Sequence, residues 1–142
     1  MKALTAFSVV LLLTPTAASA QAVPDGIHSE SRGPVVLCGL TAANVQGLKA
    51  EASASAVFVA TPIESPRFEL FTSTDADSQL IFTLPSESAY PAATCRSLYE
   101  QDGTLRMNRA MRCEAGRVEC DALFLEFQEL DAQLTQAFQK RD

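Results

Sequence analysis

The sequence predicts a single α+β domain: a small antiparallel sheet with an amphipathic C-terminal helix packed on one face, and two disulfides. Short runs rich in β-branched and aromatic residues recur at roughly 10–12-residue spacing in the middle of the chain. The C-terminal stretch shows the apolar periodicity of a helix, and the chain contains 4 Cys. A chain that is 47% hydrophobic and 20% charged does not have the composition of a disordered protein.

The first twenty residues, Met1 to Ala20, have the pattern of a secretory signal peptide. Lys2 is followed by the apolar run Ala6 to Leu13, and Ala18-Ser19-Ala20 matches a small-residue cleavage site. This apolar run is too short to cross a bilayer, so the alternative is a short buried helix. We expect cleavage after Ala20 and a periplasmic or secreted protein without a membrane anchor.

Cleavage changes the composition of the working protein. Removing 20 residues from 142 leaves 122, and the loss of Lys2 takes the net charge from -6 to -7. The mature chain is therefore acidic and has the length of one domain with a modest core. Residues 21–33 mix Pro, Gly, Ser and charge without periodicity, so we expect a flexible lead-in before a domain over residues 34–142.

The first half of the domain predicts short strands. An apolar run begins after Pro34, while Thr41 to Ala52 favours a helix by composition but is interrupted by a glycine. Three β-rich runs follow and predict an antiparallel meander; they cover Ala54 to Ala60, Arg67 to Thr72 and Gln79 to Leu84.

The second half begins with a predicted hairpin. Residues 96–101 could start a helix, but Asp102-Gly103 is a strong signal for a two-residue β-turn. In the following stretch, Thr104 to Cys113, apolar residues alternate with polar ones, except that Arg109 interrupts the apolar face. Because Met, Arg and Ala favour helices, a helix over this stretch is the alternative.

The C-terminal segment is the clearest helix of the sequence. Apolar residues recur at three- and four-residue steps, at Leu123, Phe127, Leu130, Leu134 and Ala137 or Phe138. We expect Asp121 to cap the N-terminus and Lys140-Arg141 to complement the C-terminal dipole. The stripe fits packing on the sheet better than a coiled coil or a partner helix, because no second matching helix is present.

The cysteines predict a covalent framework. An even number in a small exported domain indicates two disulfides, and four cysteines allow three pairings. We favour Cys113–Cys120, joined through a type II′ turn at Gly116-Arg117, together with Cys38–Cys95. The spacings match neither paired metal-binding cysteines nor a C-x-x-C redox site, so a metal or redox role is the weaker interpretation.

The sequence offers few groups for catalysis. His28 is the single His and lies in the lead-in, and Trp is absent. No glycine-rich nucleotide-binding motif occurs, and the acidic balance argues against nucleic-acid binding. Asp75 and Asp77 share a loop but do not match a calcium loop, because Leu80 occupies the glycine position and Ser86 the final acidic position. We predict no metal and no cofactor.

One segment departs from the acidic average. Five arginines and only three acidic residues lie between Arg96 and Arg117. Arginine suits bidentate contacts with carboxylates or phosphates, so Arg106, Arg109 and Arg112 are the candidate binding residues. The alternative is that these arginines pair with acidic residues of the C-terminal helix, among them Glu126 and Asp131.

Together these features predict a non-enzymatic exported module that binds or inhibits another envelope or secreted protein, or assists in the envelope. Two alternatives stay open. One is a small carboxylate-dependent hydrolase using Asp75 and Asp77, which a closed pocket with converging carboxylates would favour. The other is a structural subunit of an envelope assembly, which a large exposed apolar patch on the C-terminal helix would favour.

Overall fold

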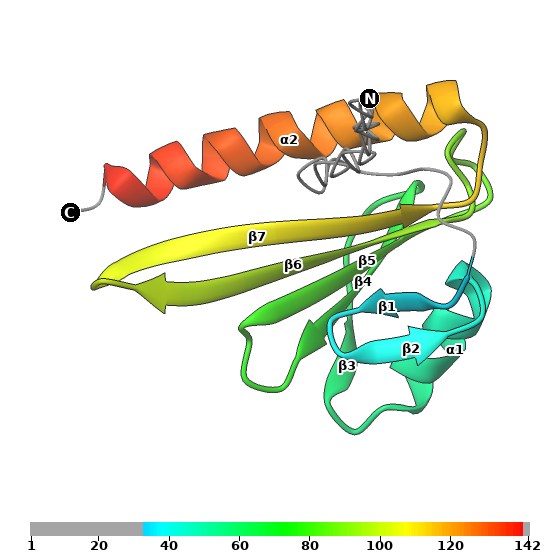
Figure 1. The fold of residues 1–142 in the computed structure, drawn as a ribbon, viewed down its shortest axis with the longest axis horizontal. Helices are drawn as coiled ribbons and strands as arrows, with labels where there is room; N and C mark the ends of the chain where they lie inside the picture. The colour runs from blue at the N-terminus through cyan, green and yellow to red at the C-terminus, as the bar shows by residue number, and fades with distance from the viewer. Residues whose placement is uncertain (1–32, 141–142) are drawn as a thin grey trace, which may run out of the picture.

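The computed structural model describes residues 33–140, and its elements form two antiparallel sheets and two helices. The predicted signal peptide and His28 lie outside the described residues. Figure 1 shows helix α2 on one side of the larger sheet and the smaller sheet with α1 on the other. In chain order the elements are β1 (Val35–Leu37), β2 (Leu40–Ala42), α1 (Val45–Ala54), β3 (Phe58–Thr61), β4 (Phe68–Ser73), β5 (Ser78–Thr83), β6 (Ala92–Gln101), β7 (Thr104–Cys113) and α2 (Arg117–Gln139).

The larger sheet is a meander in the order β3-β4-β5-β6-β7, with every neighbouring pair antiparallel. The three predicted strands are confirmed as β3, β4 and β5, with bounds shifted by a few residues. The Asp102-Gly103 turn is confirmed too: both residues have positive φ, 54° and 72°, as a type I′ hairpin requires. The stretch Thr104–Cys113 is therefore a strand, because each of its residues pairs with β6 in register.

The ambiguous segment after β2 is helical from Val45 to Ala54. Asn44 caps this helix, since its side-chain oxygen accepts a hydrogen bond from the Gly47 amide at 2.8 Å. A Cβ on Gly47 would lie 3.3 Å from that same oxygen, so the glycine that weakens helix propensity permits the close capping contact. Local capping thus outweighs the propensity cost of one glycine.

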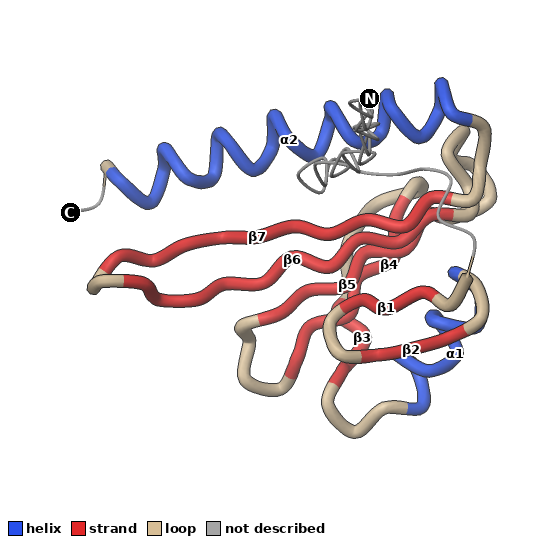
Figure 2. Tube along the Cα trace, in the orientation of Figure 1, coloured by secondary structure: helices blue, strands red, loops and turns tan. Residues whose placement is uncertain are grey.

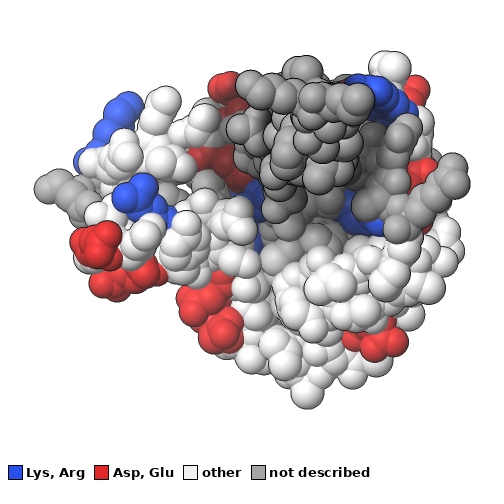
Figure 3. Space-filling view, in the orientation of Figure 1, with Lys and Arg blue, Asp and Glu red and all other residues white. Residues whose placement is uncertain are grey.

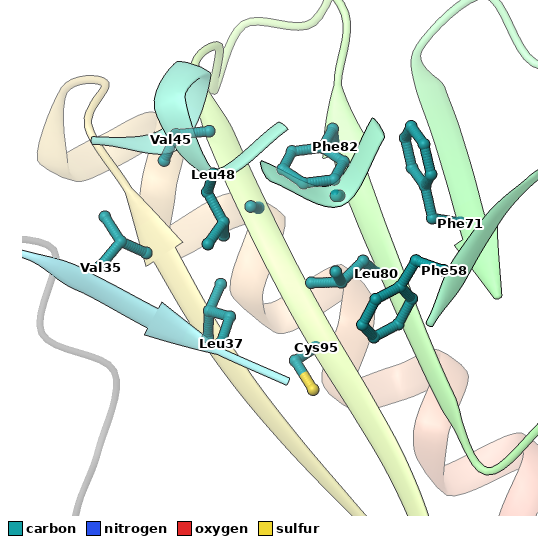
Figure 4. Packing of buried hydrophobic residues seen from close by; sticks show 11 residues of the cluster. Val35, Leu37, Val45, Leu48, Phe58, Phe71, Leu80, Phe82 and Cys95 are labelled. Atoms are coloured by element: carbon teal, nitrogen blue, oxygen red, sulfur yellow. The ribbon is translucent and has the colours of Figure 1, made fainter. Parts of the chain in front are cut away.

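Alternation along the strands gives the larger sheet two different faces. On one face, side chains of β3 to β6 pack against β1 and α1, forming the main core seen in Figure 4. Its members include Val35, Leu48, Phe71, Leu80 and Phe82, all at most 3% exposed. The other face carries Ala92, Cys113 and the partly buried Phe68, Ile81 and Met111, and it packs against α2. Both faces of the sheet are therefore covered, but by different elements.

Both predicted disulfides are present. Cys38, in the turn between β1 and β2, is bonded to Cys95 of β6, with Cα atoms 5.6 Å apart. Cys113 at the end of β7 is bonded to Cys120 in the first turns of α2, with Cα atoms 5.8 Å apart. Each bridge therefore fastens one covering element to the central sheet.

The predicted start of the C-terminal helix was wrong. Gly116 precedes the first helical residue and has φ -64° and ψ 153°, so the chain makes no type II′ turn there. Instead, the Cys120 amide donates to the Gly116 carbonyl at 2.9 Å, which places Cys120 and Asp121 inside the helix. The bridge closes because one helical turn after an extended residue brings Cys120 back to the end of β7. Within residues 33–140, no helix is both long and apolar enough to cross a membrane.

Candidate functional site: a groove between helix α2 and the sheet

Helix α2 follows the β6–β7 hairpin and leaves part of the sheet beside it uncovered. Figures 1 and 2 show α2 running lengthwise above β7, while β4 and β5 lie to one side of it. The hairpin also extends beyond the rest of the sheet, because β5 pairs with β6 only as far as Ser97. The α2-facing side of β4 and β5 therefore borders an open groove.

The groove has a volume of about 450 Å³ and a mainly apolar lining. Its floor is formed by strand residues and one wall by α2, with Ile63 of the β3–β4 connection on the opposite side. A volume in this range is typical of sites for small molecules. The apolar lining residues are Ile63, Phe68, Leu70, Ile81, Phe127, Leu130 and Leu134.

The two halves of α2 are packed differently along the groove. We call residues 117–127 the inner half and residues 128–139 the outer half. The buried helix residues all belong to the inner half, and Phe127 is only 5% exposed. One turn later Leu130 is 41% exposed, and Phe138 is 39% exposed. The outer half thus buries the predicted apolar stripe only in part, since Leu134 is half-buried and the other two are exposed.

Arg109 joins the two halves of α2 to the sheet. Its guanidinium makes two hydrogen bonds of 2.6 Å with the Asp131 carboxylate and a third, also 2.6 Å, with the Thr94 hydroxyl. The guanidinium carbon also lies 4.4 Å from the centre of the Phe127 ring. Because its side chain is only 7% exposed, Arg109 is a structural ion-pair residue at the end of the groove floor.

Arg96 is the other cation of the groove and has different partners. It lies directly opposite Arg109 in the β6–β7 pairing and opposite Gln79 in the β5–β6 pairing. Its guanidinium donates to the side-chain oxygen of Gln79, a neutral acceptor. Burial lowers the pKa of Arg96, and the neighbouring positive charge of Arg109 lowers it further. Within residues 33–140, no carboxylate lies within ion-pair distance of Arg96.

A second arginine network fixes the inner half of α2 from the other side of the groove. Arg67, before β4, makes a bidentate pair with Glu126 at 2.8 Å and also binds Glu87, whose side chain is 7% exposed. The hydrogen bond from Arg67 holds the pKa of Glu87 below its ordinary value, although burial opposes this shift. Glu126 lines the groove, but its charge is therefore already paired.

The structure does not gather the three predicted binding arginines into one site. Arg109 points to the α2 side of β7, whereas Arg106 and Arg112 belong to the opposite side, as the two-residue period requires. Arg112 is mostly buried, 3.6 Å from Glu114, and donates to the Gly33 carbonyl. Arg106 is exposed and lines a smaller cavity of about 270 Å³ between the hairpin turn and the end of α2.

Figure 3 shows how charged side chains are distributed over one face of the molecule. At the end of the molecule with the β6–β7 turn, acidic and basic side chains lie near one another, while the surface over β1 and β2 is mainly uncharged. The predicted alternative, pairing with acids of α2, is found for Arg109 with Asp131 and for Arg117 with Asp121.

The two candidate hydrolase acids lie in an exposed turn. Asp75 accepts hydrogen bonds from the Ser73 hydroxyl at 2.5 Å and from the Asp77 amide at 3.1 Å, and these lower its pKa. Both acids belong to the connection between β4 and β5, outside the residues that line the groove. Among residues 33–140, no group of three or more His, Cys, Asp or Glu could hold a metal ion.

Sequence reasoning missed the groove and the role of Arg96. One signal was available: Arg109 interrupts an apolar strand face, which indicates a cation facing the packed side of the sheet. The same alternation places Arg96 on that side of β6, together with Thr94 and Leu98. The groove itself depends on where α2 lies over the sheet, which no periodicity in the sequence specifies.

Comparisons with protein-family models, curated proteins and solved structures found no match to this chain.

Proposed function

We propose that this protein is an exported, non-enzymatic binding module that takes up an apolar ligand in the groove beside α2. Export to the periplasm or medium is supported by the two disulfides and by the signal-peptide pattern of residues 1–20. The disulfides and the paired charges of Arg67 and Arg109 hold the groove walls in place, so the site is preformed.

The observation that carries this proposal is that the outer half of α2 leaves its apolar stripe incompletely buried. Leu130 and Leu134 form one wall of a groove whose floor includes Leu70 and Ile81. Contiguous apolar surface of this kind is a cost to a protein in water, and covering it with a ligand recovers the hydrophobic free energy. The proposal replaces the arginine segment with the groove as the principal contact surface.

A neutral dye tests the proposal without involving the charges of the groove. Nile red should bind the mature protein with increased emission, and Leu134→Glu should weaken binding about tenfold, because a carboxylate would then have to be desolvated in the groove. The matched control is Leu125→Glu on the same helix, since Leu125 is 63% exposed and lies outside the groove lining. Equal dye binding by all three proteins would refute the proposed site.

A second candidate function is supported by the outward side of α2. Val118 and Leu125 are 77% and 63% exposed and lie seven residues apart, on one side of the helix. This exposed apolar surface lies outside the groove, so a groove ligand would not cover it. It fits instead the contact surface of a structural subunit in an envelope assembly. Replacing both residues with Glu should abolish association with such a partner and leave dye binding in the groove intact.

A further inference from the structure

The polar groups of the groove form a row across three strands. Gln79, Arg96 and Arg109 lie at directly opposite positions on β5, β6 and β7, on the side that faces α2. Two like charges in this arrangement repel each other, and a single carboxylate, from Asp131, makes the bidentate contact with one of them. The second guanidinium, that of Arg96, is half-buried and hydrogen-bonded to an uncharged amide.

The remaining polar side chains of the groove are already hydrogen-bonded. Glu126 binds Arg67, and the amide of Gln133 donates to Glu129 at 2.9 Å. Few groups are therefore available to satisfy the backbone N–H and C=O groups of a peptide lying in the groove, and leaving them unpaired would cost free energy. An alkyl chain has no such groups, so the apolar lining suits an aliphatic tail better than a polypeptide.

We infer that the groove binds an amphiphile with one carboxylate and an aliphatic tail, of the fatty-acid class, with the carboxylate paired to Arg96. The inference rests on the proposed binding function and names its ligand. The tail would lie along Leu70, Ile81, Leu130 and Leu134, and the carboxylate would be placed beside Arg96, the guanidinium of the row that makes no ion pair within residues 33–140. Charge-assisted hydrogen bonds to a half-buried guanidinium are stronger than those to neutral groups.

The test compares decanoate with decan-1-ol as competitors of Nile red. Both carry the same tail, but only decanoate carries a charge, so wild type should bind decanoate roughly tenfold more tightly. Arg96→Met should lose this preference and still bind the alcohol, while Arg96→Lys should retain part of it. The control is Arg117→Met, which removes an exposed arginine far from the groove lining and should keep the full preference.

A stability measurement separates a binding role of Arg96 from a structural one. Because Arg96→Met removes both the repulsion with Arg109 and the hydrogen bond to Gln79, the unfolding temperature of the free protein should change little. A large loss of stability in this variant would mean that the arginine maintains the fold, and it would count against the inference.

Each further outcome decides between the inference and the function on which it rests. If both competitors displace the dye equally, or if Arg96→Met keeps the preference, the ligand class is wrong and the binding function stands. If neither the dye nor the competitors bind, the proposed function fails as well. A dimer that dissociates on adding decanoate would show that a second copy of the chain occupies the groove. An apolar peptide that competes with the dye better than decanoate would assign the groove to a protein partner. Either result overturns the inference.

Discussion

The inner and outer halves of α2 share one apolar stripe but differ in how deeply its side chains are buried. In the inner half, Cys120, Leu123 and Phe127 are at most 5% exposed, and a disulfide ties the helix to β7. In the outer half, Leu130 and Phe138 are about 40% exposed over the hairpin and the groove. This difference shows that a continuous amphipathic pattern predicts which face of a helix is apolar. How much of that face is buried depends on the width of the sheet that lies beneath the helix.

The boundary between the halves is marked by charges. Arg109 binds Asp131 just beyond Phe127, and Arg67 binds Glu126 just before it. These pairs fix the helix at the point where packing changes from closed to open. We therefore expect the inner half to carry most of the stability contributed by α2 and the outer half to carry the binding function.

Replacing an aromatic residue in each half should give the largest contrast in stability. Phe127→Ala removes a ring that packs 5.7 Å from Phe68 and lies under Arg109, and it should lower the free energy of unfolding by about 3–5 kcal/mol. Phe138→Ala, in the outer half, should cost under about 1 kcal/mol, since the ring is already 39% exposed. Urea denaturation measures both, and equal losses would contradict the comparison.

Replacing two arginines of β7 should also give different losses of stability. Arg109→Ala leaves Asp131 without its bidentate partner and should cost about 3 kcal/mol, close to the range measured for broken buried pairs. Arg106→Ala should change the unfolding free energy by less than about 0.5 kcal/mol, because this side chain is exposed. Thermal unfolding of the two variants checks this, and a stable Arg109→Ala protein would show that the ion pair does not anchor α2.

Opening the disulfide at the start of the inner half should have an intermediate effect. The double variant Cys113→Ala, Cys120→Ala releases a short loop, with a sequence separation of 7, and should cost about 2 kcal/mol in the chain-entropy model. The corresponding variant of Cys38 and Cys95, with a separation of 57, should cost about 4 kcal/mol but leave α2 in place. Comparing the near-UV circular dichroism and denaturation of the two variants tests whether each bridge fastens its own element.

The last expected effect is a pH dependence in the Arg67 network, which holds the inner half of α2 through Glu126. The pKa of Glu87 is lowered by Arg67, so the carboxylate stabilises the fold above the ordinary value of 4.5 and loses this contribution as the pH falls through the folded-state pKa. Glu87→Gln should cost about 1 kcal/mol at neutral pH and show a shallower loss of stability on acidification. Parallel slopes for wild type and variant between neutral pH and the acidic range would refute this role.

Local chemistry made much of the fold predictable from the sequence. The Asp102-Gly103 pair specified the hairpin and the C-terminal periodicity specified α2. The favoured cysteine pairing is the one that the structure shows, although the turn on which it was argued does not form. The start of α2 was missed because an uncharged glycine precedes the helix, while the more typical capping residue Asp121 lies within it.

The candidate site was less predictable for a physical reason. A run of arginines can be recognised in a sequence, but whether each is paired depends on which strand face it occupies and on what covers that face. Arg109 is buried under α2, whereas Arg106 is exposed on the opposite side, although the two are only three positions apart in the sequence. The groove arises from the path of one helix over several strands, a long-range arrangement that no local pattern encodes.

Amide hydrogen exchange along α2, with and without decanoate, tests the central claim most directly. In the free protein, amides of the inner half should be protected to near the global unfolding free energy, while those of the outer half should exchange through local opening, at least tenfold faster. Adding decanoate should slow exchange selectively in the outer half. Uniform protection along the helix, unchanged by the ligand, would contradict the division of α2 into a structural half and a binding half.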